Sequence, residues 1–254
     1  MSYVEAVVRH ERRILIASLI AIPVLCAAWI VPMASDMYGA MTGPSAWMMT
    51  RVWDARHLSL LAAMWIVMMI GMMLPSVSPM LLLYAGVLRA SPEGPKAALR
   101  VYAMAAGYLL MWIAFSLLAT GMQRALGETM LTPMMTPRSS AVAALLLLIA
   151  AAYQLTPFKE MCLHSCRSPI AFMMRHIRLD AAGAFRLGIE HGLHCVGCCW
   201  ALMLLLFAGG IMNLWTIAAL MIAVLLEKVA PLGLWTKQLT AAALVAAAIW
   251  VVVR

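Results

Sequence analysis

The chain alternates long apolar runs with short gaps that are polar and basic. Seven runs stand out, covering residues 14–33, 58–88, 99–121, 140–157, 186–209, 212–230 and 234–253. About 20 apolar residues in a helix cross the hydrocarbon core of a bilayer, and each run approaches or exceeds that length. The pattern therefore predicts an all-α, polytopic transmembrane helix bundle of about seven spans, with residues 1–254 forming one integral membrane domain.

The composition supports a membrane protein and excludes several other classes. Of the 254 residues, 65% are hydrophobic and 11% are charged, and the mean hydropathy is +0.95. No soluble globular domain has this balance. The formal net charge of +8 raises the question of nucleic-acid binding, but the basic residues lie between the apolar runs, where they set topology. We therefore expect the lipid bilayer as a partner and no nucleic acid.

Two runs carry further local information. The first follows basic residues without a convincing cleavage site, which indicates a retained anchor and not a removed signal peptide. The second, 58–88, is too long for one straight span and contains Pro75 and Pro79. We expect it to kink, with Ser76 and Ser78 satisfying the backbone carbonyls of residues 71 and 75 that the prolines leave unpaired.

The gaps between the runs predict the loops. Residues 34–57 and 122–139 are expected outside the membrane, and residues 158–185 form the main inside loop, which is the most basic segment. Gly209 and Gly210 predict a tight turn between the fifth and sixth spans.

The fifth run holds the densest set of chemically active side chains. It contains His191, His194, Cys195, Cys198 and Cys199 within nine residues. On a helix the first four share one face, whereas Cys199 projects about 100° from Cys198. Imidazole and thiolate suit Cu(I), zinc and iron, and the thiolates favour soft metals. We favour a metal or redox role over small cysteines that only pack a helix interface.

A second group of candidate ligands follows the fourth span. Cys162, His164 and Cys166 lie in the expected inside loop. In an extended segment these alternate residues could bind one metal, whereas on a helix Cys162 and Cys166 would share a face. Incidental thiols in a solvated loop are the simpler alternative.

Methionines and one carboxylate complete the candidate ligands. Met72, Met73 and Met80 flank the two prolines, and their thioethers would suit Cu(I), although methionine is also common filler in apolar cores. Glu227 could ligate a metal, orient an imidazole or carry a proton. With Lys228 it could instead form a pair that reaches the membrane surface.

The positions of the cysteines predict both their compartment and a shared site. Five of the six fall between residues 162 and 199, on the expected cytoplasmic side, where reducing conditions favour free thiols or metal thiolates. His191 to Cys198 covers about 10 Å along a helix, which one tetrahedral ion cannot use in full. Either two ions bind along this face, or one ion completes its shell elsewhere; we expect the site to draw ligands from a second segment, with residues 162–166 favoured.

Three longer motifs resemble those of a known family. They are Met64-Trp-x-x-Met-Met-x-x-Met-Met-Leu-Pro-Ser-x-x-Pro-Met80, Tyr153-Gln-Leu-Thr-Pro-Phe-Lys-x-x-Cys162-Leu-x-x-Cys166-Arg-Ser-Pro169, and His191-Gly-Leu-x-Cys195-x-Gly-Cys198-Cys199-Trp200 with Met212-Asn213 and Leu226-Glu227-Lys228. Over about residues 58–235 the chain resembles the bacterial family of uncharacterised, predicted metal-binding integral membrane proteins. The resemblance implies metal binding through cysteines and histidines and implies no established reaction. His194 departs from the family pattern, which often has an aromatic residue there.

These observations favour one function and leave two alternatives. The first is a multi-pass protein of the bacterial inner membrane that handles, delivers or transports a soft metal. We expect Cu(I), with zinc or iron as possibilities, and a metallochaperone or metalloenzyme as partner. The second is a membrane copper or iron redox enzyme. The third is a thiol–disulfide oxidoreductase that uses Cys195 and Cys198, with Cys162 and Cys166 as a shuttle pair.

The charge asymmetry generates a topology prediction. With the N-terminus in the cytoplasm, 13 of the 18 lysines and arginines fall in inside segments, which predicts a cytoplasmic N-terminus and a periplasmic C-terminus. Reporter fusions to each end, one active only in the cytoplasm and one only in the periplasm, test this. Both ends on one side would contradict the odd number of spans.

Overall fold

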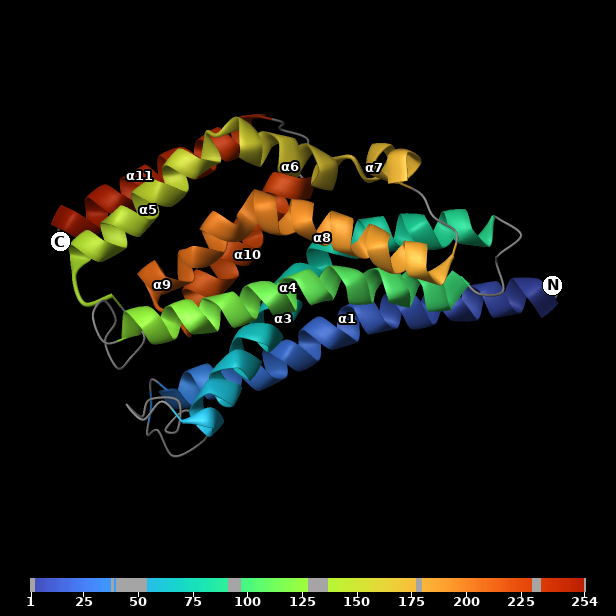
Figure 1. The fold of residues 1–254 in the computed structure, drawn as a ribbon, viewed down its shortest axis with the longest axis horizontal. Helices are drawn as coiled ribbons and strands as arrows, with labels where there is room; N and C mark the ends of the chain where they lie inside the picture. Colours follow the sequence, from blue (N-terminus) through green and yellow to red (C-terminus); the bar gives the residue numbers. More distant parts are fainter. Residues whose placement is uncertain are drawn as a thin grey trace.

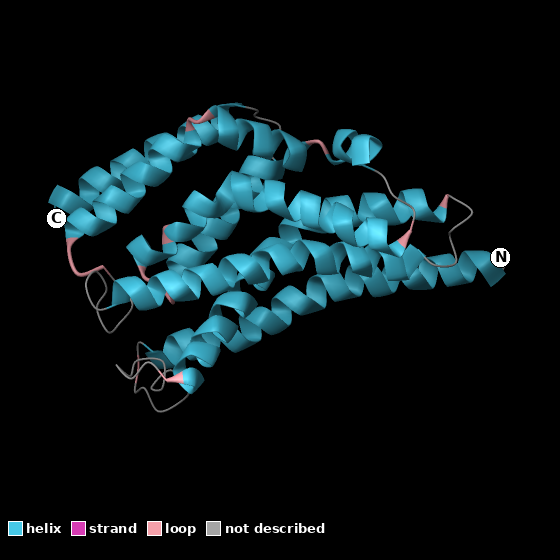
Figure 2. Cartoon of the chain, viewed as in Figure 1, coloured by secondary structure: helices cyan, strands magenta, loops and turns pink. Residues whose placement is uncertain are grey.

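The described part of the chain is helical. The computed structural model describes residues 3–37, 39, 54–90, 97–127, 137–176, 180–229 and 234–253, and Figure 2 draws no strand in these ranges. The helices are α1 (Tyr3–Met37), α3 (Ala55–Arg89), α4 (Ala97–Gly127), α5 (Ser140–Gln154), α6 (Pro157–Arg167), α7 (Pro169–His176), α8 (Ala181–Leu204), α9 (Leu206–Gly209), α10 (Leu214–Val229) and α11 (Leu234–Val253). The all-α prediction is confirmed. Most of the two expected outside loops, residues 40–53 and 128–136, lies outside the described ranges.

Several of these helices are long and apolar enough to cross a membrane. Within the described residues there are five, or six if the bent pair α5 and α6 forms one span. The sixth expected span, 212–230, corresponds to α10, whose 16 residues extend about 24 Å. The difference from about seven spans therefore lies in the short α10.

The helices form a bundle with a diverging pair beside it. α4 packs against α3 and α8, and α1 packs against α3. α5 and α11 lie side by side and diverge from the central helices (Figure 1). The two ends of the chain lie at opposite ends of the molecule's long axis.

The segment 158–185 corrects the expectation of a loop, because most of it is helical. α5 ends at Gln154, and α6 begins at Pro157 after a bend of 68°. The hydroxyl of Thr156 accepts a hydrogen bond from the backbone N–H of Lys159, and proline is well suited to the first helical position. A cap and a proline together start a new helix where the apolar run stops.

The proline segment of α3 also differs from the expected pairing. α3 continues through Pro75 and Pro79 as one helix. Ser76 donates a hydrogen bond to the carbonyl of Met73 over 2.8 Å, and Ser78 donates to the carbonyl of Leu74 over 3.0 Å. The serine hydroxyls thus reach carbonyls three and four residues back, and not those of residues 71 and 75, because their short side chains fold onto the preceding turn.

Glycines bring the backbones of α4 and α8 into direct contact. A Cβ atom added to Gly188 would lie 2.0 Å from the carbonyl oxygen of Met104, and one added to Gly107 would lie 2.1 Å from that of Phe185. Small residues permit this close approach between membrane helices, where packing stabilises association. The contact sets the separation of the two helices that carry Tyr108 and Cys195.

This contact predicts that Gly188→Ala will destabilise the bundle. The added methyl must displace a backbone carbonyl, so we expect a loss of about 2 kcal/mol or more, the upper part of the range for overpacking. Thermal unfolding in detergent measures the effect. Gly121→Ala is the matched control, because a Cβ there meets nothing within 4 Å. Equal stability of both variants would contradict the direct backbone contact.

Candidate metal centre

Cys195 lies at the centre of a buried polar network. The side chain is fully buried on α8. Lys228 of α10 donates a hydrogen bond from Nζ to the Cys195 sulfur over 2.9 Å, and the hydroxyl of Tyr108 on α4 lies 3.0 Å from the same sulfur. An ammonium group beside a buried sulfur offsets negative charge on that sulfur, which an apolar layer would otherwise disfavour.

The proline segment of α3 joins this network. Lys228 also donates to Ser76 Oγ over 3.0 Å, and that oxygen lies 3.3 Å from the Tyr108 hydroxyl. The Tyr108 hydroxyl in turn donates to the carbonyl oxygen of Met73 over 3.2 Å. Four segments far apart in the sequence, α3, α4, α8 and α10, therefore meet around one sulfur.

Four of the other five thiols gather where α6 packs on α8. Cys166 Sγ lies 3.9 Å from Cys198 Sγ. The thiols of Cys198 and Cys199 both donate to the carbonyl oxygen of Cys195, over 3.1 and 2.8 Å. A Cβ atom added to Gly197 would lie 2.8 Å from Cys162 Sγ, so Cys162 also contacts α8. Of the two alternatives for residues 162–166, the helical one is therefore correct, and the extended chelating segment is excluded.

Two of the sulfurs lie at a separation that suits a shared metal ion, but a third ligand is not yet in position. Two bonds of about 2.3 Å to one ion place two sulfurs about 3.8–4.0 Å apart at tetrahedral or trigonal angles. The Cys166–Cys198 separation of 3.9 Å meets this requirement. Within the described ranges, however, no three His, Cys, Asp or Glu side chains are already arranged to hold an ion. To bind an ion here, at least one more donor side chain would have to rotate toward the Cys166 and Cys198 sulfurs.

Glu227 serves a different purpose from its neighbour Lys228. Its Oε2 lies 2.6 Å from Lys159 Nζ and its Oε1 accepts from Gln154 over 2.9 Å, all three side chains being buried. Arg167 donates to the Glu227 backbone carbonyl. Both carboxylate oxygens thus have protein partners, and the contacts anchor α6 to α10.

His191 lies one turn before Cys195 and is almost completely buried. Its ring lies 5.9 Å from that of Tyr108 and 5.1 Å from that of Phe172 on α7, measured between ring centres. Among the described residues, its Nδ1 atom has no hydrogen-bond partner. An unpaired buried nitrogen is unusual and leaves this imidazole available to a ligand.

The other two predicted histidines are placed less centrally. His194 is half-buried, and its Nδ1 lies 2.8 Å from the carbonyl oxygen of Glu190. Its ring also contacts Phe172, at 5.6 Å between ring centres. His164 is exposed on α6, on a different face from the two cysteines that flank it in sequence.

The three methionines lie in the core of α3. Met72, Met73 and Met80 are all buried. Of these, Met73 joins the network through its backbone carbonyl oxygen, which accepts from Ser76 and Tyr108. The structure therefore connects the methionine segment to the site by its backbone.

Sequence reasoning missed three members of the network. Tyr108 lies in an apolar run without any distinguishing motif, and Ser76, although part of the first motif, was expected to pair only with backbone carbonyls of its own helix. Lys228 did carry a signal, because a lysine inside a membrane segment usually faces an interior partner. The sequence paired it with the adjacent Glu227, although neighbouring helical residues project about 100° apart.

The comparisons with known proteins identify the family. A family model described as PpoB2, copper chaperone, matches residues 62–251. The chain belongs to this copper chaperone family. The match confirms the expectation of a metal-handling family, with copper as the metal in general terms. No curated protein and no solved structure matched the chain.

The contacts of Glu227 predict that it is a structural anchor. Removing its charge with Glu227→Gln leaves Lys159 buried without a counter-ion, which should cost on the order of 3 kcal/mol in unfolding free energy. We expect copper bound per folded protein to stay unchanged. Unfolding in detergent and elemental analysis measure the two quantities.

The matched control is Glu160→Gln. Glu160 pairs with Lys237 over 2.7 Å, but its side chain is 35% exposed. A pair this accessible should contribute less than about 1 kcal/mol. Loss of copper from folded Glu227→Gln protein would instead make this carboxylate a ligand.

Proposed function

We propose that this chain holds Cu(I) within the inner membrane on the thiols of Cys166, Cys195 and Cys198, and delivers it to a recipient protein. The observation that best supports this proposal is the 3.9 Å separation of the Cys166 and Cys198 sulfurs, which come from different helices. Cys195 lies one turn from Cys198 on the same face of α8. Together these residues offer three soft donors from two helices.

The donor types favour copper over the other metals considered. Thiolates are soft ligands and select Cu(I) over magnesium, calcium or manganese. Cu(I) also tolerates low coordination numbers, so three sulfurs suffice without further ligands. Cys162, Cys199 and the nitrogen of His191 lie beside these sulfurs and provide additional donors for loading or release.

Lys228 offsets the negative charge that such a site would carry. Several thiolates around one Cu(I) carry net negative charge, which is costly in an apolar layer. The Lys228 ammonium, 2.9 Å from the Cys195 sulfur, offsets part of that charge. Lys228 is therefore a positioning residue that acts through the sulfur and does not bind the metal.

The distribution of thiols supports delivery over transport across the membrane. Five of the six cysteines lie on α6 and α8, while Cys26 lies on α1 beside Gly71, where an added Cβ would be 2.9 Å from Cys26 Cβ. A transporter needs successive ligands along its path, whereas these donors form one group. We propose a metallochaperone or a metalloenzyme as the exchange partner.

Copper binding to single-cysteine variants tests the proposal. After anaerobic purification and loading with Cu(I), Cys198→Ser and Cys166→Ser should bind copper at least about tenfold more weakly, a loss of about 1.4 kcal/mol. Lys228→Met should also weaken binding, whereas Lys228→Arg should retain most of it because the charge remains. Competition against a chromogenic Cu(I) chelator measures these affinities.

Cys26→Ser is the matched control, because Cys26 lies away from the other thiols. It should bind copper as the unchanged protein does. If all of these variants bound Cu(I) with equal affinity, the proposal that the thiols bind copper would be contradicted.

One observation favours a second candidate, a thiol–disulfide oxidoreductase. The Cys166 and Cys198 sulfurs need to approach by only about 2 Å to form a disulfide of about 2.05 Å. In that case the pair would exchange disulfides with a partner, and copper would bind without consequence for activity. Trapped mixed disulfides in Cys198→Ser cells would favour this function, while their absence together with tight Cu(I) binding favours copper delivery.

A further inference from the structure

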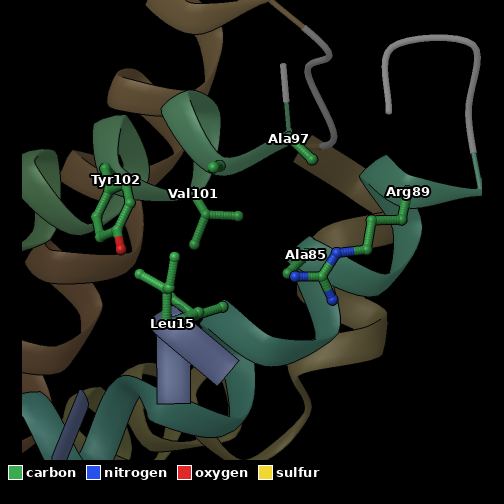
Figure 3. A pocket seen from close by; sticks show the side chains of 8 residues that line it. Leu15, Ala85, Arg89, Ala97, Val101 and Tyr102 are labelled. Atoms are coloured by element: carbon green, nitrogen blue, oxygen red, sulfur yellow. The ribbon is translucent and has the colours of Figure 1, made fainter. Parts of the chain in front are cut away.

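A cavity opens between α1, α3 and α4, away from the thiols. Its volume is about 270 Å³ (Figure 3). Its walls are mainly apolar and come from Ile14 and Leu15 of α1, Ala85 of α3, and Ala97, Ala98 and Val101 of α4. The space equals that of about nine water molecules at about 30 Å³ each, but apolar walls do not hold water well.

One cationic group faces this apolar space. Figure 3 shows the guanidinium of Arg89, in the last turn of α3, turned toward the cavity near Ala85 and Leu15. Its Nε atom is buried and has no hydrogen-bond partner in the part of the chain that the structure describes. Buried donors are nearly always paired, and a guanidinium matches the oxygens of a phosphate.

We propose that this cavity binds one acyl chain of an anionic phospholipid, with the lipid phosphate on Arg89. The apolar walls suit a hydrocarbon chain, and the unpaired nitrogen suits the headgroup. Inorganic phosphate alone could bind Arg89 but would leave the apolar walls of the cavity without an apolar ligand. The lipid is the ligand that brings both chemistries together.

The position of the cavity along the helices suits a phospholipid. It lies between the end of α3 and the start of α4, next to segments that hold many of the basic residues. Anionic headgroups attract such basic segments at the cytoplasmic surface of a membrane. Tyr102, at the wall, is 43% exposed, and tyrosines favour the boundary between headgroups and hydrocarbon.

Native mass spectrometry of the full chain in detergent tests the proposal. The protein is titrated with phosphatidylglycerol, phosphatidylcholine or inorganic phosphate. We expect about fivefold tighter binding of phosphatidylglycerol than of phosphatidylcholine, which corresponds to about 1 kcal/mol for one basic residue. Arg89→Gln should abolish this preference, and Arg89→Lys should keep part of it. Ala98→Leu, which fills the cavity, should weaken the binding of both lipids.

Arg124→Gln is the matched control, since Arg124 is exposed at the opposite end of α4. It should keep the phosphatidylglycerol preference. An unchanged preference in Arg89→Gln, unchanged lipid binding in Ala98→Leu, or displacement of the lipid by an equal concentration of inorganic phosphate would each overturn the proposal. Copper binding by Arg89→Gln should match that of the unchanged protein, so this test is independent of the copper site.

Discussion

The ammonium of Lys228 lies 2.9 Å from the sulfur of Cys195 in the apolar interior of the bundle, and the arrangement of the surrounding helices depends on this contact. A charged group at such a depth is costly unless partners within the protein surround it. Ser76 and Tyr108 are two such partners. Ser76 accepts a hydrogen bond from the Lys228 nitrogen, and the Tyr108 hydroxyl lies within hydrogen-bonding distance of the Cys195 sulfur. Pairing this half-buried cation therefore holds α3, α4, α8 and α10 together at one point.

Close helix packing makes this pairing possible. Gly107 precedes Tyr108 on α4, and Gly188 lies two turns before Cys195 on α8. Because neither glycine has a side chain, the two backbones meet, and the Tyr108 hydroxyl comes within 3.0 Å of the sulfur. A wider separation of α4 and α8 would remove the hydroxyl from the network. The packing and the chemistry of the site are thus parts of one arrangement.

Glu227 and Lys228 show how one turn of helix can serve two requirements. Lys228 faces the thiol of α8, whereas Glu227 faces Lys159 and Gln154 and anchors α6. Because α6 carries Cys166, this buried ion pair also positions the thiol that meets Cys198. A structural salt bridge therefore stabilises the fold around the candidate copper site, although it contains no proposed ligand.

The sequence by itself determined the helical class and the residues of the site that share one helix face. Apolar runs of near-membrane length predict spanning helices, and a one-face spacing places His191, Cys195 and Cys198 together, because both depend only on local periodicity. Thr156 and Pro157 also carry a local signal for a helix start, which the expectation of a loop overlooked.

Only the tertiary structure decided which segments meet. The rotation of each helix and the order of its neighbours come from packing between distant residues, which periodicity does not encode. For this reason the contacts of Tyr108 and Ser76 around the Cys195 sulfur were not predicted, and His164 proved to be exposed although Cys162 and Cys166 face α8. The partner of Lys228 was likewise decided by the fold, since the sulfur it contacts lies 33 residues earlier in the chain.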